Sequence, residues 1–425
     1  MQFLRQKGYI HFIGIGGVGM QTLAGILLEK YPGEAVISGS DLEKSERTEK
    51  LKSLGVEIFY GHNKSNLPTW CDLVVYSSAV KEDNPEYAEA KKRGFCVVRR
   101  GELLAALATT YDKVAIVSGS HGKTSTCATL VHLLKKQGVD CGYLIGGELF
   151  NGNSFAAGDG RIFVTEADES DGTHVLFKPD VNIVVNLDDD HAWSVGGEEQ
   201  LKQNFLASAR KSKKILYLKD EIKDNIFRRF KKAEGYSPED IRKLNYPSNI
   251  IGYQKKNSFL ALKALEALGM EVKTEDLADF CNVKRRMTTI CKKENFVLLE
   301  DYAHHPKELQ SSLELLREKY ADYRLTVIFQ VHRAARMNKY FNDFAEILGK
   351  MADRVILSRI FEAWVSGESN YTPQNLADKL ANGSYMEDFE DIKKEIMQIS
   401  ESSTKELVAI IGAGDIHNII AELKL

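Results

Sequence analysis

The chain has 425 residues, of which 43% are hydrophobic and 28% charged, a balance typical of globular proteins that bury substantial cores. Its length predicts about two to four domains. A net charge of −3 gives no excess of basic residues that would attract anionic partners. We therefore expect neither nucleic acid nor a membrane surface as a partner. The N-terminus lacks the apolar core of a signal peptide, and no apolar run is long enough to span a bilayer. These features predict a cytoplasmic protein.

Cysteine usage agrees with a reducing compartment. None of the six cysteines forms a Cys-x-x-Cys pair, and most lie in apolar runs. Reduced, buried thiols are the expected state of such residues.

The first third of the chain alternates strand and helix patterns. A glycine turn joins the first strand to the first helix, and the predicted elements are strands at 9–13, 35–38 and 73–77 and helices at 18–30 and 45–54. This β-α-β order predicts a parallel sheet in a Rossmann-like domain over residues 1–108.

The second third repeats the arrangement from a new strand. A second glycine turn separates a strand at 113–117 from a helix at 124–136, and further strands are predicted at 161–165 and 180–186. The segment 211–245 is basic and has few strand signals, so we expect it to be mainly helical. A helix at 257–268 completes a predicted P-loop domain over residues 109–282.

The last third shows the same alternation. Apolar strand patterns at 296–299, 325–329, 354–357 and 407–411 are separated by helix patterns such as 306–320. They predict a second Rossmann-like domain over residues 283–425 and, for the chain as a whole, an α/β fold of three domains in series.

The first glycine turn is typical of a nucleotide site. It reads Gly14-Ile-Gly16-Gly17-Val18-Gly19, between a strand and a helix. Glycines there allow a tight turn and a close approach of the backbone to a phosphate at the helix N-terminus. Asp41 lies 22 residues beyond Gly19, where a carboxylate could bind sugar hydroxyls. Taken alone, this turn would also suit an NAD-dependent oxidoreductase or a purely structural role.

The second glycine turn is a shortened P-loop. It reads Gly119-Ser120-His121-Gly122-Lys123-Thr124, with two residues instead of four between its glycines. Backbone N–H groups would surround phosphate oxygens, the lysine would neutralise them, and the threonine hydroxyl would face Mg²⁺. Two phosphate-binding turns in one chain indicate two substrates that carry nucleotides.

Ordered motifs along nearly the whole chain resemble those of the Mur ligase family, in particular its members that act on UDP-N-acetylmuramate. Besides the two glycine turns, the matching segments are Gly39-Ser40-Asp41, Ser77-Ser78-Ala79, Glu166 to Asp171, Asn186 to His191, Lys284-Arg285-Arg286, Asp301 to Pro306, His332 to Arg336 and Gly412 to Asp415. Their number and order make the resemblance far more specific than any one motif.

The resemblance implies an ATP-dependent amide-forming ligase of peptidoglycan precursor synthesis. ATP would phosphorylate the lactyl carboxylate of UDP-N-acetylmuramate, and the amine of an amino acid, L-alanine in the close relatives, would displace the phosphate. The implied cofactors are ATP and Mg²⁺. The implied partners are these small molecules only, and the expected state is a monomer or weak homodimer.

The resemblance also assigns site residues. It places the UDP-substrate at Gly16, Gly17, Val18, Gly19, Ser40, Asp41, Ser77 and Ser78. It places ATP at Gly119, Ser120, His121, Gly122, Lys123, Thr124, Ser125, Gln254, Asn257, Arg286 and Asp301. It places the amino acid at Tyr302, His304, Arg333 and Arg336, and the metal at Thr124, Glu169 and His191. The catalytic groups are Lys123, Glu169, His191, His304 and Arg333.

The chemistry of these side chains suits their assigned roles. Glu169 and His191 each follow a predicted strand, and carboxylate oxygen and imidazole can both bind Mg²⁺. Arg333 and Arg336 are three residues apart, so one helical turn would align their guanidinium groups toward a carboxylate. Purely structural roles are the alternatives. Glu169 and His191 could be an acidic cluster with a capping histidine, and Arg333 and Arg336 could be surface arginines at a helix start.

Three departures from the family pattern bear on the substrates. Alanine and tryptophan follow His191, the adenine motif reads Gly252-Tyr-Gln254-Lys-Lys-Asn257, and the stretch from Phe205 to Gly252 is short. Phe205 stands near the place where other Mur ligases carry a carbamylated lysine, so we expect none. A paralogue or murein-peptide ligase with another amino acid, peptide or sugar therefore stays open. An NAD-dependent oxidoreductase and a catalytically inactive binding protein are the alternatives from other classes.

Overall fold

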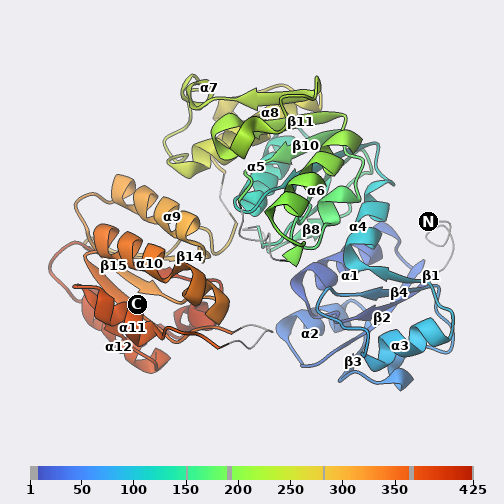
Figure 1. The fold of residues 1–425 in the computed structure, drawn as a ribbon, viewed down its shortest axis with the longest axis horizontal. Helices are drawn as coiled ribbons and strands as arrows, with labels where there is room; N and C mark the ends of the chain where they lie inside the picture. The colour runs from blue at the N-terminus through green and yellow to red at the C-terminus, as the bar shows by residue number, and fades with distance from the viewer. Residues whose placement is uncertain (1–7, 150–151, 189–193, 281–282, 363–367, 424–425) are drawn as a thin grey trace. The chain divides into compact units, whose positions relative to one another are not determined.

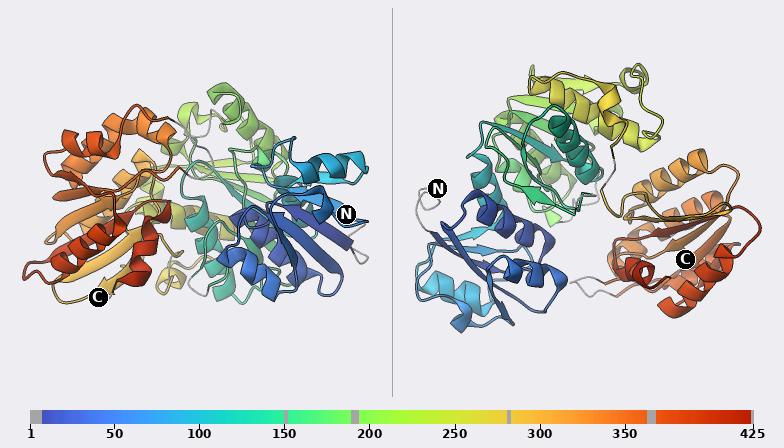
Figure 2. Two further views of the ribbon diagram at one scale, coloured as in Figure 1. Left: turned by 90° about the horizontal axis from the view of Figure 1, so that it is seen from below. Right: turned by 180° about the vertical axis from the view of Figure 1, so that it is seen from behind.

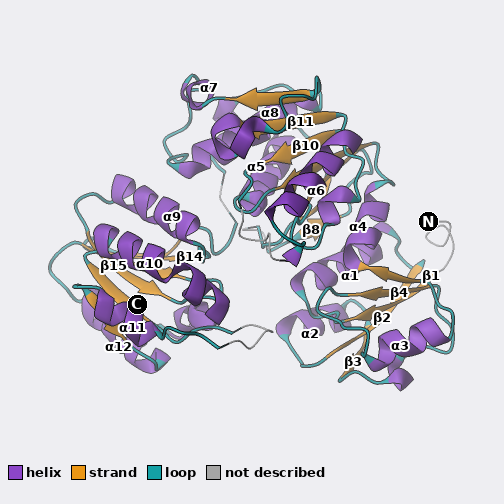
Figure 3. Ribbon diagram, in the orientation of Figure 1, coloured by secondary structure: helices purple, strands orange, loops and turns teal. Residues whose placement is uncertain are grey.

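The computed structural model describes residues 8–149, 152–188, 194–280, 283–362 and 368–423. Chain contacts divide it into two compact units (Figure 1). One unit contains residues 1–250 and 255–281, and the other contains 251–254 and 282–425. Strands and helices alternate through both units, which confirms the predicted α/β class (Figure 3).

The first sheet of unit 1 contains five parallel strands in the order β3-β2-β1-β4-β5. The strands are β1 Gly8–Ile13, β2 Ala35–Asp41, β3 Glu57–Tyr60, β4 Leu73–Tyr76 and β5 Val97–Arg99, and the helices are α1 Val18–Lys30, α2 Glu46–Ser53, α3 Pro85–Lys92 and α4 Arg100–Ala108. Alternate residues of β1 enter different clusters: Phe12 packs with α1 and α4, and Ile13 packs with α3. Both faces of the sheet are therefore buried, as in doubly wound folds.

The second sheet of unit 1 has seven strands in the order β12-β11-β10-β6-β9-β7-β8, of which β8 is antiparallel. The strands are β6 Lys113–Ser118, β7 Gly142–Leu144, β8 Phe155–Ala156, β9 Ile162–Glu166, β10 Val181–Val184, β11 Lys214–Leu218 and β12 Ala233–Tyr236. The helices are α5 Lys123–Lys136, α6 Glu198–Lys211, α7 Pro238–Arg242 and α8 Tyr253–Ala267. Helices α5 and α8 share one apolar cluster with the sheet, and α6 packs on another.

The prediction of a mainly helical segment at 211–245 is wrong. Two parallel strands, β11 and β12, extend the sheet there, and the only α-helix assigned within it, α7, has five residues. The run Ile215 to Leu218 is almost fully buried, so its apolar character is that of an interior parallel strand. The surrounding lysines and arginines obscured this short strand signal.

Unit 2 is built on a six-stranded sheet in the order β13-β14-β18-β15-β16-β17, with only β13 antiparallel (Figure 2). The strands are β13 Thr288–Lys292, β14 Phe296–Asp301, β15 Arg324–Phe329, β16 Arg354–Leu357, β17 Gly383–Tyr385 and β18 Glu406–Ile411, and the helices are α9 Pro306–Lys319, α10 Ala334–Met351, α11 Pro373–Lys379 and α12 Phe389–Ser400. Helices α9 to α11 cover one apolar cluster, and α12 covers the other with the 3₁₀ segment η8, Asp415–Glu422.

Each sheet lies within one of the three predicted domains, although the boundaries at 108 and 282 stay predictions. None of the helices that the structure describes is long and apolar enough to cross a membrane. The described cysteines are Cys71, Cys96, Cys127, Cys141 and Cys291, and all are free thiols. The expectation that such cysteines are buried is wrong for Cys96, which is exposed, and for Cys291, which is half-buried.

Candidate active site

The first glycine turn lies at the carboxyl end of β1 and is held from the neighbouring strand. Gly16 donates its backbone N–H to the carboxylate of Asp41 at 2.7 Å, and Arg47 donates to the Gly16 carbonyl at 2.7 Å. A Cβ on Gly16 would stand 2.8 Å from the Asp41 carboxylate, so only glycine allows this approach. Asp41 thus shapes the turn itself, a role that its sequence position did not suggest.

The serines predicted to bind the UDP-substrate differ in their surroundings. Ser40 is fully buried, and its hydroxyl donates to Glu86 at 2.8 Å, so it stabilises the domain interior. Ser77 lies against Gly14, and its hydroxyl accepts the Ala79 N–H at 3.3 Å. Ser78 is exposed. At the turn itself Val18 is also exposed, which leaves the N-terminus of α1 accessible.

Arg100 is a residue at this turn that sequence reasoning missed. Its side chain reaches to 3.1 Å from the position that a Cβ of Gly19 would occupy, and it donates to Asp171 at 3.0 Å. A guanidinium beside the positive end of a helix is unfavourable unless anions surround it. Asp171 belongs to the acidic motif after β9, so Arg100 connects the first turn to the second sheet.

The second glycine turn is shaped by Asn186, which follows β10. The Asn186 amide accepts the His121 N–H at 3.0 Å and donates to the His121 carbonyl at 2.9 Å. Gly119 has a φ of +125°, and a Cβ there would lie 2.7 Å from the Asn186 carbonyl. Gly122 is left-handed at +83° and caps α5, so Lys123, Thr124 and Ser125 form that helix's first turn. The turn therefore exposes a helix N-terminus, as phosphate binding requires.

Lys123 and Glu169 form a buried ion pair inside this turn. The ammonium Nζ lies 3.0 and 3.1 Å from the two oxygens of Glu169 and also donates to the Gly119 carbonyl at 2.6 Å. Burial raises the pKa of Glu169, and Asp168 adds to that effect, whereas Lys123 opposes it. Burial alone would lower the pKa of Lys123, but the carboxylates of Glu169, Asp168 and Glu166 outweigh it. The lysine is thus held charged where phosphate would bind.

Two of the three predicted metal ligands, Thr124 and Glu169, belong to the described residues. Thr124 lies one residue after Lys123, and the Glu169 side chain is fully buried. His191 lies outside the described residues. Among the residues that are described, no group of three or more His, Cys, Asp or Glu side chains is arranged to hold a metal on its own.

The two amides predicted to bind adenine lie in or beside the first turn of α8. Asn257 is buried, and a Cβ on Gly122 would stand 2.9 Å from its side-chain oxygen. Among the residues that the structure describes, its amide nitrogen has no hydrogen-bond partner. Gln254 instead accepts the Ile251 N–H at 3.3 Å, which caps the helix. Asn257 therefore lies at the P-loop, whereas the side chain of Gln254 is bonded to the backbone just before its own helix.

In unit 2, the residues around Tyr302 form a compact polar site at the carboxyl end of β14. Arg285 and Arg286 each lie 4.9 Å from the centre of the Tyr302 ring. Asp301 is buried and accepts from the N–H groups of Met287 and Ala303, both at 2.8 Å. Asp301, predicted to bind the ATP ribose, therefore holds the loop that carries the two arginines.

His304, His332 and Arg336 lie together at the start of α10. The two imidazole rings are 5.6 Å apart, and the guanidinium of Arg336 contacts His332 Nδ1 at 3.0 Å. Burial, opposed by Glu308 but reinforced by Arg336, lowers the pKa of His304 to about 4. Burial, together with His304 and the arginines, lowers the pKa of His332 to about 3. Both histidines are neutral at pH 7 and add no charge to the arginines.

Arg333 has a strained backbone. It caps α10 with a φ of +74° and ψ of 138°, a region that side-chain-bearing residues rarely adopt, and its N–H donates to the Phe361 carbonyl at 2.8 Å. Arg336 lies in the first turn of α10, but Arg333 stands before the helix, so the two arginines do not share the predicted helical turn. Non-glycine residues in such conformations often belong to functional sites.

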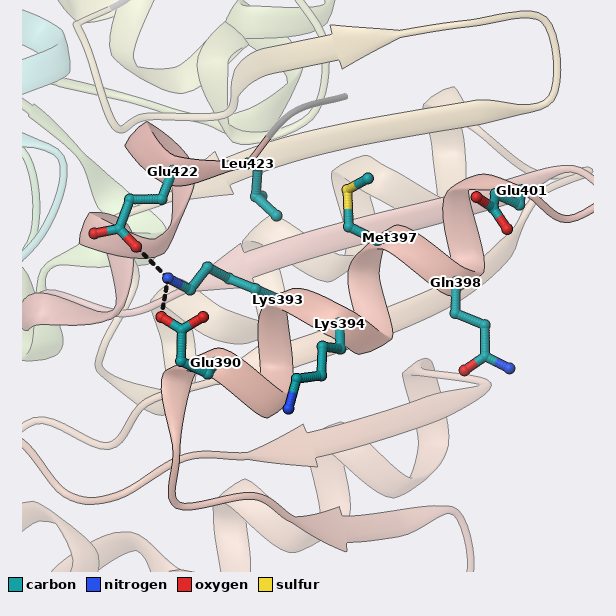
Figure 4. A pocket seen from close by; sticks show the side chains of 8 residues that line it. All are labelled: Glu390, Lys393, Lys394, Met397, Gln398, Glu401, Glu422 and Leu423. Carbon is teal, nitrogen blue, oxygen red and sulfur yellow. Dashed lines mark hydrogen bonds and ion pairs between the residues drawn. The ribbon is translucent and has the colours of Figure 1, made fainter.

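A hollow elsewhere in unit 2 contains none of the predicted residues (Figure 4). It lies along α12 and η8, where Lys393 bonds to both Glu390 and Glu422. Its walls carry charged side chains, and none of the predicted site residues lines it. It therefore takes no part in the candidate site.

Comparison with known proteins identifies the family of the chain. The description "Mur ligase family, catalytic domain" matches residues 9–112, and "Mur ligase, glutamate ligase domain" matches residues 285–414. UDP-N-acetylmuramate–L-alanine ligases of Carboxydothermus hydrogenoformans and Aquifex aeolicus are each 32% identical to the chain. The alignments cover 98% and 96% of the chain and 96% and 95% of those proteins.

Solved structures share the fold. The UDP-N-acetylmuramate–alanine ligase of Thermotoga maritima superposes with a TM-score of 0.80 at 24% identity, covering 98% of each chain. A murein peptide ligase of Psychrobacter arcticus gives 0.67 at 23% identity, also over 98% of each chain. A bifunctional folylpolyglutamate synthase/dihydrofolate synthase, solved with manganese, AMPPNP and L-glutamate, gives 0.56 at 14%, over 76% of this chain and 93% of that one. With two family models and curated relatives along its whole length, the chain belongs to the Mur ligase family of ATP-dependent ligases.

Proposed function

We propose that the chain joins L-alanine to the lactyl carboxylate of UDP-N-acetylmuramate in peptidoglycan precursor synthesis. The carboxylate oxygen attacks the γ-phosphorus of ATP, the bond to ADP breaks, and an acyl phosphate forms. The alanine amine then attacks the acyl carbon and loses a proton, and phosphate leaves. The observation that carries this proposal is the buried Lys123–Glu169 pair at a P-loop, within one compact unit that also contains the first glycine turn.

The unit 1 residues suit the first half-reaction. The Lys123 ammonium sits at the N-terminus of α5, where it would neutralise charge as two anions, the carboxylate and the γ-phosphate, approach each other. The first glycine turn would take the diphosphate of the UDP-sugar at the N-terminus of α1. The unpartnered amide nitrogen of Asn257 at Gly122 would donate to the adenine of ATP.

The residues present suit Mg²⁺ as part of this site. A buried carboxylate at Glu169 and a hydroxyl at Thr124 are the hard oxygen donors that magnesium prefers, and phosphate oxygens and water complete such shells. The ion supplies charge neutralisation between the two anions. Glu169 would then be a ligand of the ion, and Lys123 would be available to the phosphates.

The unit 2 residues suit the incoming amino acid. Arg333 caps α10 and Arg336 lies in its first turn, and each guanidinium group can bind a carboxylate through two N–H donors. The neutral His304 lies beside His332 and Arg336 and would accept a hydrogen bond from the amine. Tyr302, held between Arg285 and Arg286, would form the wall of that pocket.

The organisation of the molecule is proposed on the same basis. We infer three domains, 1–108, 109–282 and 283–425, because each of these ranges contains one complete sheet. A cytoplasmic enzyme that acts as a monomer or weak homodimer is consistent with free cysteines and small-molecule substrates.

ADP release with UDP-N-acetylmuramate and a panel of amino acids tests the function. We expect ATP-dependent turnover that is highest with L-alanine. Turnover only with the tripeptide L-alanyl-γ-D-glutamyl-meso-diaminopimelate would instead favour the murein peptide ligase activity, a second candidate that the fold similarity to that enzyme raises. No turnover with either nucleophile would refute both.

A further inference from the structure

Cations that the proposed reaction does not use gather at one edge of the second sheet. Strands β10, β11 and β12 are parallel neighbours, so their amino ends meet at the edge opposite to the one that carries the P-loop after β6. The segments 175–181, 210–214 and 231–234 lead into these strands and include seven basic and two acidic residues, a local net charge of +5. The basic residues are Lys178, Arg210, Lys211, Lys213, Lys214, Lys231 and Lys232. We call these three segments the basic edge.

Hydrogen bonds join the three segments into one surface. The Lys213 N–H donates to the Pro179 carbonyl at 2.9 Å, and the Lys232 carbonyl accepts the Ile215 N–H at 3.0 Å. The Lys232 ammonium also donates to the Arg210 carbonyl at 2.9 Å. The cations therefore come from three separate parts of the chain and form a cluster in space, which no basic run along a single helix would produce.

Acidic residues neutralise only part of this charge. Lys213 pairs with Asp180 and Lys214 pairs with Glu234, both at 2.7 Å. Among the residues that the structure describes, the other five cations have no acidic partner: Lys178, Arg210, Lys211, Lys231 and Lys232. All of these except Lys232 are exposed. The basic edge therefore presents uncompensated positive charge to solvent.

The net charge of the whole chain conceals this local excess. A total of −3 leaves −8 on the residues outside the basic edge. Electrostatic attraction in water is screened over about 10 Å at 0.1 M salt, so a partner responds to the charge that it faces and not to the total. Net charge alone therefore does not exclude an anionic partner at this edge.

The side chains between the cations indicate which anionic partner fits. Leu176 is 44% exposed, and Lys211 lies beside it because its ammonium donates to the Val175 carbonyl at 2.7 Å. Phe177, the single aromatic residue in the sequence of the three segments, is buried and cannot stack on a base. One exposed leucine is too little for the apolar centre of a stable protein interface. Cations around an exposed apolar side chain suit the headgroups and the acyl boundary of an anionic lipid surface.

We propose that the basic edge binds the surface of an anionic lipid bilayer. Lipid phosphates attract the five cations that have no acidic partner, and Leu176 enters the boundary between headgroups and acyl chains. Attraction of this kind is reversible and weakens as salt rises. The P-loop lies at the opposite edge of the same sheet, so this contact keeps the P-loop away from the lipid. The contact is additional to the proposed ligase reaction and does not depend on it.

Co-sedimentation of the full chain with lipid vesicles gives the first test. The vesicles consist of phosphatidylcholine, with or without the anionic phosphatidylglycerol. We expect sedimentation only with the anionic vesicles, and its loss as salt rises from about 0.05 M to about 0.5 M, because the screening length shortens. Equal sedimentation with both kinds of vesicle, or with neither, would overturn the proposal. No turnover is measured, so this result is separate from a failure of the proposed ligase activity.

A triple variant tests whether the basic edge is the surface that binds. Lys178→Gln, Arg210→Gln and Lys231→Gln are combined in one chain, since all three side chains are exposed and have no acidic partner among the described residues. Each cation at an anionic surface contributes about fivefold in affinity, so the triple variant should bind anionic vesicles about 10²-fold more weakly. An unchanged vesicle affinity would show that another surface makes the contact.

A second triple variant controls for total charge. Lys50→Gln, Lys91→Gln and Lys92→Gln remove the same charge from exposed lysines of α2 and α3. This variant should keep the wild-type vesicle affinity to within about threefold, because these lysines do not belong to the proposed contact surface. Equal losses in the two triple variants would overturn the assignment to the basic edge. Urea unfolding of both variants should match that of the wild type, because all six positions are exposed.

Competition distinguishes lipid from nucleic acid. Single-stranded RNA or duplex DNA is added to the protein bound to vesicles, at a phosphate concentration equal to that of the anionic lipid. The protein should stay with the vesicles, because the basic edge has no exposed aromatic side chain among its described residues. Release by either nucleic acid, with tight binding to it that the first triple variant loses, would assign the basic edge to nucleic acid instead.

Discussion

At the scale of single residues, Lys123 combines a structural and a catalytic role. Its ammonium is the counter-charge of the fully buried Glu169 and lies at the P-loop. Lys123→Ala should lower ADP release by about 10²-fold or more, because a charge aimed at the transferring phosphoryl group is lost. Binding of the UDP-sugar should persist. Lys136→Ala, later on the same helix in an exposed pair with Asp279, is the control. Near-normal ADP release by Lys123→Ala would refute the assignment.

Arg333 should serve the function of the protein, although its backbone conformation lowers the stability of the fold. Its φ of +74° costs an ordinary residue on the order of 1–3 kcal/mol, and glycine avoids that cost. We expect Arg333→Gly to unfold at higher denaturant concentration than Arg333→Ala. Both variants should raise the KM for the amino acid yet still form acyl phosphate, which hydroxylamine trapping detects. If neither variant forms a trapped product, Arg333 belongs to the first half-reaction.

The sequence predicted the residues of the motifs but not their local partners. Lys123 and Arg336 each lie in the first turn of a helix, while the ligands assigned to them stay predictions. Ser40 and Asp41 stand in a matching motif too, yet one is buried against Glu86 and the other holds the glycine turn. Such contacts join residues 25 to 46 positions apart, and no local pattern in one sequence reveals them.

At the scale of elements, the fully buried carboxylate of Glu86 in α3 joins β1 and β2 through hydrogen bonds with His11 and Ser40, both at 2.8 Å. Its contribution to stability should depend on pH. The folded pKa of Glu86, about 2, lies below the ordinary value of 4.5. The stabilisation is therefore fully present above about pH 4.5 and is lost as pH falls toward 2. A shift of this size corresponds to about 3 kcal/mol.

Urea unfolding of wild type and Glu86→Gln between pH 7 and pH 3 measures this dependence. The difference in unfolding free energy should be largest at pH 7 and should shrink below pH 4.5. A difference that stays constant over this range would show that packing, and not the ionised carboxylate, accounts for the effect.

The first turn of α8 should set the affinity for ATP. Asn257 is buried beside Gly122, and its amide nitrogen has no hydrogen-bond partner among the described residues. An acceptor nitrogen of adenine could be that partner. Asn257→Ala should raise the KM for ATP several-fold, leave the KM for the UDP-sugar unchanged and weaken the preference for ATP over GTP. Equal use of ATP and GTP by the wild type would contradict this role.

Elements were predictable where their apolar pattern was distinct from the flanking residues. The helix predicted at 18–30 has those bounds, and the strand predicted at 354–357 does too. Strands β11 and β12 escaped prediction because they lie among basic residues, and because the buried face of β11 is completed by Phe205 and Phe227 from other segments. Phe205 packs in that core.

At the scale of the molecule, alternating patterns predicted three sheets but not how their cores are shared. Residues of α1 and α4 from the first sheet and Phe163 from the second belong to one apolar cluster in unit 1. Unit 2 has clusters of its own. Shared burial of this kind couples the unfolding of two sheets, whereas separate cores allow units to unfold independently.

Gly25 of α1 tests that coupling, because it lies where the two sheets meet. A Cβ there would stand 2.3 Å from the Phe155 ring of β8, so Gly25→Val must displace that ring. Overpacking of this kind typically costs about 1–3 kcal/mol. Hydrogen exchange should then quicken in both β1 and β6, while β15 of unit 2 keeps its wild-type protection. Phe155→Ala in the same chain should restore part of the loss, giving a coupling between the two positions. Faster exchange confined to the first sheet would show that the two sheets of unit 1 unfold separately despite their common core.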